Sequence, residues 1–207
     1  MLGVSWGTAV YEVAHALRPP AQQRITVVQM IGALGTADPQ IDGPELARWI
    51  AQVYGGSYRT LPAPLIVDSA EVRDALMTDR SIAGPLDLAS KVDMALVGIG
   101  TVDREMSSLV RAGYLTAGQL DAIAAEGAVG DVCAIHFDQQ GNVLDIPITR
   151  RTVGIPYEQF ARISLRMGVA GGEVKAPAIL GALRAGLISC LVTDDVAAQR
   201  ILELVAA

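Results

Sequence analysis

Residues 2–8, with the sequence LGVSWGT, join a predicted strand over Leu2–Ser5 to a predicted helix over Thr8–Leu17. Small residues after the strand let backbone N–H groups converge, and the start of the helix adds partial positive charge. The hydroxyls of Ser5 and Thr8 can add hydrogen bonds. The segment therefore predicts a strand–turn–helix unit that can hold a phosphate. An ordinary tight turn, with Thr8 capping the helix, explains the same residues equally well.

The same alternation of β-rich runs and helical patterns continues along the chain and favours a mainly parallel sheet with helices on both faces. The other predicted strands are Ile25–Met30, Ser57–Leu61, Val92–Gly98, Asp131–Phe137, Ser164–Ala170 and Ile188–Thr193. The other predicted helices are Pro44–Tyr54, Ala70–Thr78, Ala117–Glu126, Glu173–Ala185 and Val196–Val205. Residues 138–142, DQQGN, predict a hairpin turn within an antiparallel pair. The sequence thus predicts one Rossmann-like α/β domain over residues 1–207.

Composition supports a buried aliphatic core and excludes several functions. Hydrophobic residues make up 51% of the 207 residues, aromatic residues 4% and charged residues 18%, as expected for a sheet covered by helices. The net charge of −6 and the lack of a basic run argue against nucleic-acid binding by this chain itself. No signal peptide or apolar membrane span is evident, so we expect a cytoplasmic protein. Cys133 and Cys190 lie in apolar runs and are expected to be buried free thiols, with no disulfide and no metal site.

Candidate ligand residues follow several predicted strands, where α/β sheets bind their ligands. Gln29 ends the second strand and faces either a ligand hydroxyl or local backbone. Leu61–Pro64 predicts a stiff, extended loop that forms a wall of a pocket, and a bend that merely ends the strand explains the same residues at least as well. Gly98 and Gly100 permit close backbone approach after the fourth strand, and the polar residues Asp103–Ser108 are a candidate lid.

Charged candidates lie in the second half of the chain. Asp131 opens a buried strand after a glycine-rich bend and can accept sugar hydroxyls, although a structural hydrogen bond also explains it. Gly171 and Gly172 form the tip of another loop before Lys175. A lysine in a first helical turn is disfavoured by the helix dipole, so a bound anion would account for it; the alternative is a solvated surface lysine. Asp194 is expected to cap the last helix.

Together these residues fit a small polyhydroxylated anion such as a phosphorylated sugar. No catalytic residue is assigned, because His15 lies within a predicted helix and His136 within a predicted strand. Asp131 and Lys175 nevertheless form a candidate acid–base pair, and Lys175 a candidate Schiff-base lysine, so an enzyme is the alternative. A purely structural oligomerisation domain is a third hypothesis. No cofactor is predicted, since the chain has neither a Walker A loop nor a G-x-G-x-x-G fingerprint.

The ordered set of motifs resembles the sugar-binding domain of SorC/DeoR-type bacterial transcriptional regulators over nearly the whole chain. The motifs occupy residues 3–8, 27–29, 61–64, 97–100, 111–115, 127–131, 170–175 and 191–194. The resemblance implies a fold similar to the glucosamine-6-phosphate deaminase, ribose-5-phosphate isomerase and CoA-transferase group. It also implies a sugar-phosphate effector that is bound without turnover. The matching positions make Ser5, Trp6, Gly7 and Thr8 the phosphate loop, Asp131 and Lys175 effector contacts, and Gln29 a neighbour of the sugar.

The resemblance has two departures. Family members carry an N-terminal helix-turn-helix domain, which is absent from these 207 residues, so DNA contact is expected only through a domain outside this chain. Their effector domains usually begin with a further strand and helix, whereas the first predicted strand here starts at Leu2. We therefore expect an N-terminally incomplete effector domain that controls carbohydrate metabolism genes, self-associating as a homodimer or homotetramer. An isomerase or deaminase of sugar phosphates on the same fold is the alternative.

Overall fold

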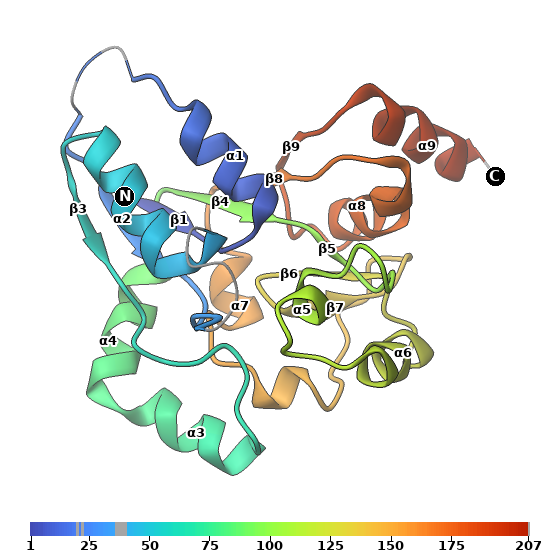
Figure 1. Cartoon of the computed structure of the whole chain (residues 1–207), viewed down its shortest axis with the longest axis horizontal. Helices are drawn as coiled ribbons and strands as arrows, with labels where there is room; N and C mark the ends of the chain where they lie inside the picture. The colour runs from blue at the N-terminus through green and yellow to red at the C-terminus, as the bar shows by residue number, and fades with distance from the viewer. Residues whose placement is uncertain (20, 22, 36–40, 207) are drawn as a thin grey trace.

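The computed structural model describes residues 1–19, 21, 23–35 and 41–206, and a parallel sheet organises them (Figure 1). Within the described residues, six strands form this sheet in the order β3-β2-β1-β4-β8-β9, and each neighbouring pair is parallel. The strands are β1 (Leu2–Val4), β2 (Thr26–Gln29), β3 (Ser57–Arg59), β4 (Met94–Gly98), β8 (Leu165–Val169) and β9 (Cys190–Val192). Their ends differ from the predicted ones by a residue or two. The predicted Rossmann-like sheet is confirmed.

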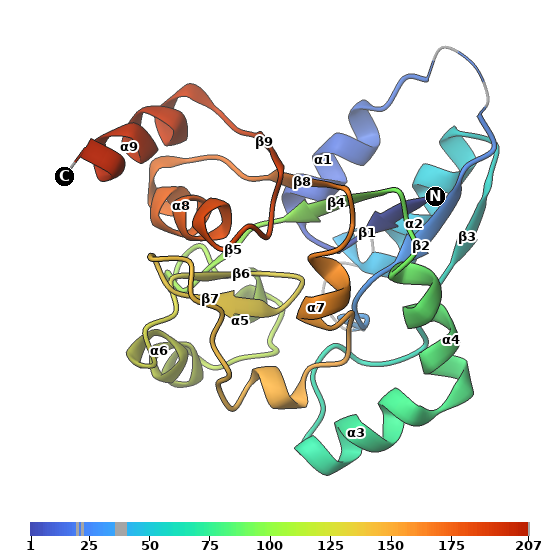
Figure 2. The same ribbon diagram turned by 180° about the vertical axis from the view of Figure 1, so that it is seen from behind.

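Helices cover both faces of the sheet, as predicted (Figures 1 and 2). On one face, Val4, Val27 and Leu96 pack against α1 (Thr8–Ala16) and α2 (Gly43–Val53). On the other face, Val28, Met30, Ala95 and Val97 belong to a larger cluster with Ala89 and Ile179. Those two residues lie in α4 (Arg80–Ala89) and α8 (Ala176–Arg184). The remaining helices are α3 (Ala70–Thr78), α5 (Ser108–Arg111), α6 (Ala117–Ala125), α7 (Tyr157–Phe160) and α9 (Asp195–Ala206).

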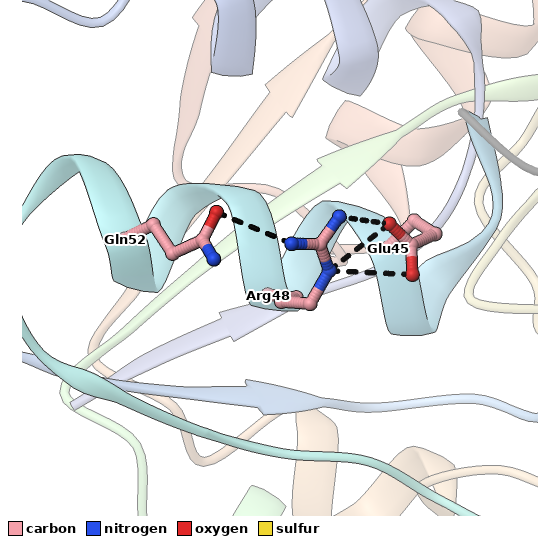
Figure 3. A network of polar contacts seen from close by, with 3 residues as sticks. All are labelled: Glu45, Arg48 and Gln52. Carbon is pink, nitrogen blue, oxygen red and sulfur yellow. Dashed lines mark hydrogen bonds and ion pairs between the residues drawn. The ribbon is translucent and has the colours of Figure 1, made fainter.

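Helix α2 shows how the local sequence sets burial. The Asp42 carboxylate accepts a hydrogen bond from the backbone N–H of Gly43 at 2.7 Å and so caps the start of the helix. Leu46, Ala47 and Ile50 are buried on the inner side. The polar side holds Glu45, Arg48 and Gln52, and Figure 3 shows the Arg48 guanidinium between the other two. Arg48 lies 2.6 Å from Glu45 and 3.3 Å from Gln52. Spacings of three and four residues bring these polar side chains together on one side of α2.

A second, small sheet corrects the predicted strand Asp131–Phe137, which is wrong as a single element. The described residues there form β6 (Gly130–Val132) and β7 (Ile135–Phe137), an antiparallel pair, with β5 (Gly100–Thr101) on the other side of β6. Cys133 and Ala134 make the turn, with φ of 52° and 59°. Such turns usually carry Asn or Gly. Because residues 132–137 lack both, the sequence gives no sign of a turn there. The turn predicted at residues 138–142 is present, since Asp138 accepts from the backbone N–H of Asn142 at 2.8 Å.

Three other expectations need adjustment. Helix α4 was not predicted, because it contains Pro85, a residue that usually ends a helix. The helix predicted over Glu173–Ala185 begins as a 3₁₀ turn over Glu173–Lys175 and continues as α8.

Cys133 is a buried free thiol as expected, whereas the free thiol of Cys190 is only half-buried. In the described part of the chain, none of the helices combines the length and apolarity needed to span a membrane.

Candidate effector-binding cleft

The strand order reverses between β1 and β4, and a cleft lies at that point. From β1 the sheet continues through β2 to β3, and from β4 it continues through β8 to β9. Ligands of open α/β sheets bind at such a switch point, beyond the carboxyl ends of the strands. Eight of the predicted site residues line this cleft together: Ser5, Trp6, Gly7, Thr8, Gly98, Gly100, Asp131 and Lys175.

The start of helix α1 provides the cleft with partial positive charge. Gly7 is the N-cap residue with φ of 129°, and no side chain caps the helix. The first turn carries no acidic side chain, while Thr8 and Ala9 line the cleft. The positive end of the helix dipole is therefore not neutralised by a local carboxylate, which favours an anion at this position.

Ser5 ties the loop after β1 to the end of β4. Its side chain is buried, and its Oγ accepts from the backbone N–H of Gly98 at 3.2 Å. The same hydroxyl donates to the carbonyl of Trp6 at 3.3 Å. The Trp6 ring packs against both hydrophobic clusters, and its buried Nε1–H has no hydrogen-bond partner among the described residues. These contacts hold the two strand ends in a fixed relation at the floor of the cleft.

Lys175 reaches the cleft from the loop after β8. Its Nζ donates to the carbonyl oxygen of Ile99 at 2.9 Å. Burial lowers the pKa of Lys175 below its ordinary value, Asp131 opposes this effect, and the nearby charge of Arg111 adds to it. A second acceptor, such as a phosphate oxygen, would stabilise the charged form of this half-buried lysine.

Asp131 lies opposite Gly100 in the register between β5 and β6. Its Oδ2 accepts from the backbone N–H of Ala134 at 3.0 Å. A Cβ atom at position 100 would lie only 2.0 Å from Oδ1, so glycine makes room for this carboxylate. On the other side, Asp131 pairs in register with His136, whose pKa is lowered by burial. The carboxylate holds the hairpin turn with one oxygen and lines the cleft.

Three predicted site residues do not line the cleft. Gln29 is fully buried, its Nε2 donates to the carbonyl of Ile31 at 2.7 Å, and its Oε1 accepts from the N–H of Leu61 at 3.0 Å. The alternative that Gln29 serves local backbone is therefore the one that the structure supports. Gly171 and Gly172 lie in the loop before Lys175, and Gly172 donates its N–H to Asp194 at 2.8 Å.

Sequence reasoning missed several residues that line the cleft. These are Ala9, Ile31, Leu65, Ile99, Thr101, Leu109, Cys133 and Ala134, whereas Ser107 and Ser108, which also line it, belong to the candidate lid. The candidate lid, Asp103–Ser108, is a hydrogen-bonded turn in which Asp103 accepts from Glu105 and Met106, both at 3.0 Å. Ser107 then caps α5. A serine before an apolar run, typical of a helix N-cap, was the available signal for α5. The neighbouring strand β5 has only two residues and could not be recognised from sequence.

Comparisons with known proteins identify the family of this chain. The family model described as "Putative sugar-binding domain" matches residues 1–203. The deoxyribonucleoside regulator of Bacillus subtilis (strain 168) is 30% identical over 203 residues, covering 98% of this chain and 64% of that protein. The transcriptional regulator LsrR of Enterobacter sp. (strain 638) is 34% identical over 208 residues, covering 99% and 62%. The chain thus spans less than two thirds of the length of these curated relatives.

Solved structures show the same fold. The full-length sorbitol operon regulator SorC of Klebsiella pneumoniae superposes with a TM-score of 0.89 at 25% identity, covering 97% of this chain and 66% of that one. A domain of a transcriptional repressor from Vibrio fischeri gives 0.88 at 32% identity, covering 100% and 80%. This chain therefore belongs to the family of sugar-binding domains found in SorC- and DeoR-type transcriptional regulators.

Proposed function

We propose that this domain binds a phosphorylated sugar as the effector of a cytoplasmic transcriptional regulator of carbohydrate metabolism, without turning the sugar over. The observation that carries the proposal is the cleft between β1 and β4, where the uncapped start of α1 and Lys175 line the same hollow. Both favour an anion in the cleft, although the chain as a whole has a net charge of −6. Contact with DNA would come from a helix-turn-helix domain, and the regulator would act as a dimer or tetramer.

The residues suggest a division of roles within the cleft. The phosphate lies at the start of α1, near Gly7 and Thr8, where helix N–H groups and the dipole favour it. Lys175 supplies a full positive charge from the opposite loop. The Asp131 carboxylate has acceptor capacity beyond its bond to Ala134 and accepts sugar hydroxyls.

Calorimetry with a panel of pentose and hexose phosphates tests this proposal. Lys175→Ala is expected to weaken binding by about tenfold or more, since a charge-assisted hydrogen bond contributes about 1.5–3 kcal/mol. Lys91→Ala is the matched control, because the chain has only two lysines and Lys91 pairs with Asp87 on the surface. Equal affinities for the two variants would refute the assignment of Lys175.

One observation favours an enzyme as the second candidate function. Lys175 has a lowered pKa and feels the charge of Asp131 within the cleft, which is an arrangement found in acid–base sites. Incubation of the chain with each sugar phosphate, followed by NMR, distinguishes the two functions. Unchanged ligand signals are expected, and formation of an isomerised or deaminated product would overturn the proposal of an effector.

A further inference from the structure

The side chain of Asp194 makes contacts with two different loops. It follows β9, and its Oδ1 accepts from the backbone N–H of Ala197 at 2.8 Å, which caps the start of α9. Its Oδ2 accepts from the backbone N–H of Gly172 at 2.8 Å. The sequence predicted only the first of these contacts, because the second joins residues that are far apart along the chain.

The second contact leads directly to Lys175. The carbonyl of Gly172 accepts from the backbone N–H of Lys175 at 3.1 Å, and the Nζ of Lys175 donates to Ile99 at 2.9 Å. An unbroken series of hydrogen bonds therefore joins Asp194 to the cleft. Glycines allow this approach: Gly172 has φ of 90°, and a Cβ at Gly171 would lie 2.4 Å from the Asp194 carboxylate.

We propose that Asp194 is a positioning residue for the effector site, which fixes the loop Gly171–Lys175 so that Lys175 reaches the cleft. This inference rests on the proposed function for the role of Lys175, but it concerns a residue outside the cleft. A helix cap alone does not require aspartate, since serine and asparagine cap equally well. Only a carboxylate offers two acceptor oxygens, one for each loop.

The variant Asp194→Ser separates the two contacts. Serine retains a hydroxyl that can cap α9 but has no second oxygen for Gly172. We expect a folded chain in which Lys175 is less fixed and more solvated. Asp195→Ser is the matched control, because Asp195 is the exposed neighbouring carboxylate in the first turn of α9.

Two measurements follow the effect. With only two lysines in the chain, reductive ¹³C-methylation and NMR titration report Lys175 with Lys91 as internal reference. In Asp194→Ser the pKa of Lys175 is expected to rise toward its ordinary value, and in Asp195→Ser it is expected to stay at the wild-type value. The affinity for inorganic phosphate, measured by calorimetry, is expected to fall about tenfold only in Asp194→Ser.

The outcomes are distinguishable. An unchanged Lys175 pKa and unchanged phosphate affinity in folded Asp194→Ser would overturn the positioning role. If the wild-type chain binds no phosphate or sugar phosphate, the proposed function fails, while the Lys175 titration still tests whether Asp194 holds the loop. Should Asp194→Ser not fold, Asp194→Asn serves as the second variant. Its amide oxygen caps the helix and its NH₂ group cannot accept from Gly172, so the same two results are expected.

Discussion

Lys175 is a charged and partly buried side chain, so its loss of a proton should change the affinity for an anionic ligand. Burial and Arg111 lower its pKa, and Asp131 partly offsets them. We predict that phosphate affinity falls as pH rises through this lowered pKa, because the neutral amine attracts the anion less. Calorimetry from pH 6 to pH 10 measures the decline, and Lys175→Arg, which stays charged, should remove it. An affinity that stays constant up to pH 10, just below the ordinary lysine pKa of ~10.4, would contradict the prediction.

The same shift affects the stability of the free chain with a definite sign. A lowered pKa means that folded Lys175 releases its proton at a pH where the unfolded chain still holds it. The contribution of Lys175 to the free energy of unfolding therefore increases with pH between the two values. Bound phosphate favours the protonated form and reduces this dependence.

Single residues also show where sequence reasoning succeeds and where it stops. Ser5 and Lys175 could be placed at strand ends because hydrophobic runs mark where strands finish. Gln29 satisfies the same criterion, yet its amide bonds to Ile31 and Leu61. The strand pattern shows that Gln29 lies at a strand end. Whether its amide bonds to backbone or to a ligand depends on Leu61, which a tertiary contact brings beside it.

Among the elements, the sheet β5-β6-β7 depends on glycine at position 100. Gly100→Ala would place a Cβ 2.0 Å from Oδ1 of Asp131. Asp131 must then rotate, or β5 must move away from β6. We predict a loss of sugar-phosphate affinity of about tenfold or more and a lower melting temperature, measured by calorimetry and thermal unfolding.

A matched glycine serves as the control for that prediction. Gly118 lies in α6, and a Cβ there would meet nothing within 4 Å. Gly118→Ala should leave ligand affinity unchanged and raise stability by about 0.5–1 kcal/mol, since alanine favours the helix. Similar losses of affinity in both variants would show that the close contact with Asp131 is not the cause.

At the scale of the whole molecule, the alternation of strands and helices was enough to predict a parallel sheet with two covered faces. It did not give the strand order, because periodicity carries no information about which strands pair. The position of the cleft follows from that order, since it lies where β1 and β4 meet. The second sheet escaped prediction because β5 has two residues and the Cys133–Ala134 turn has no turn-forming residue. The local sequence was therefore enough to single out Asp131, whereas its contacts with Gly100 and Ala134 could be known only from the structure.

Because the cleft is built from both halves of the sheet, a bound effector should stabilise the chain as one unit. The loop after β1 belongs to one half of the sheet. Lys175 follows β8 in the other half, and Asp131 lies in β6 of the small sheet that follows β4. A ligand that binds only the folded state adds about 2.7 kcal/mol to the free energy of unfolding at 100 times its Kd. We predict a single unfolding transition that shifts to higher temperature with sugar phosphate. We also predict slower hydrogen exchange in the loop after β1 and in the segments that carry Asp131 and Lys175. Lys175→Ala should need a higher ligand concentration for the same shift. Protection restricted to the loop after β1 would instead place the ligand on the α1 side alone and would contradict a site shared by the two halves.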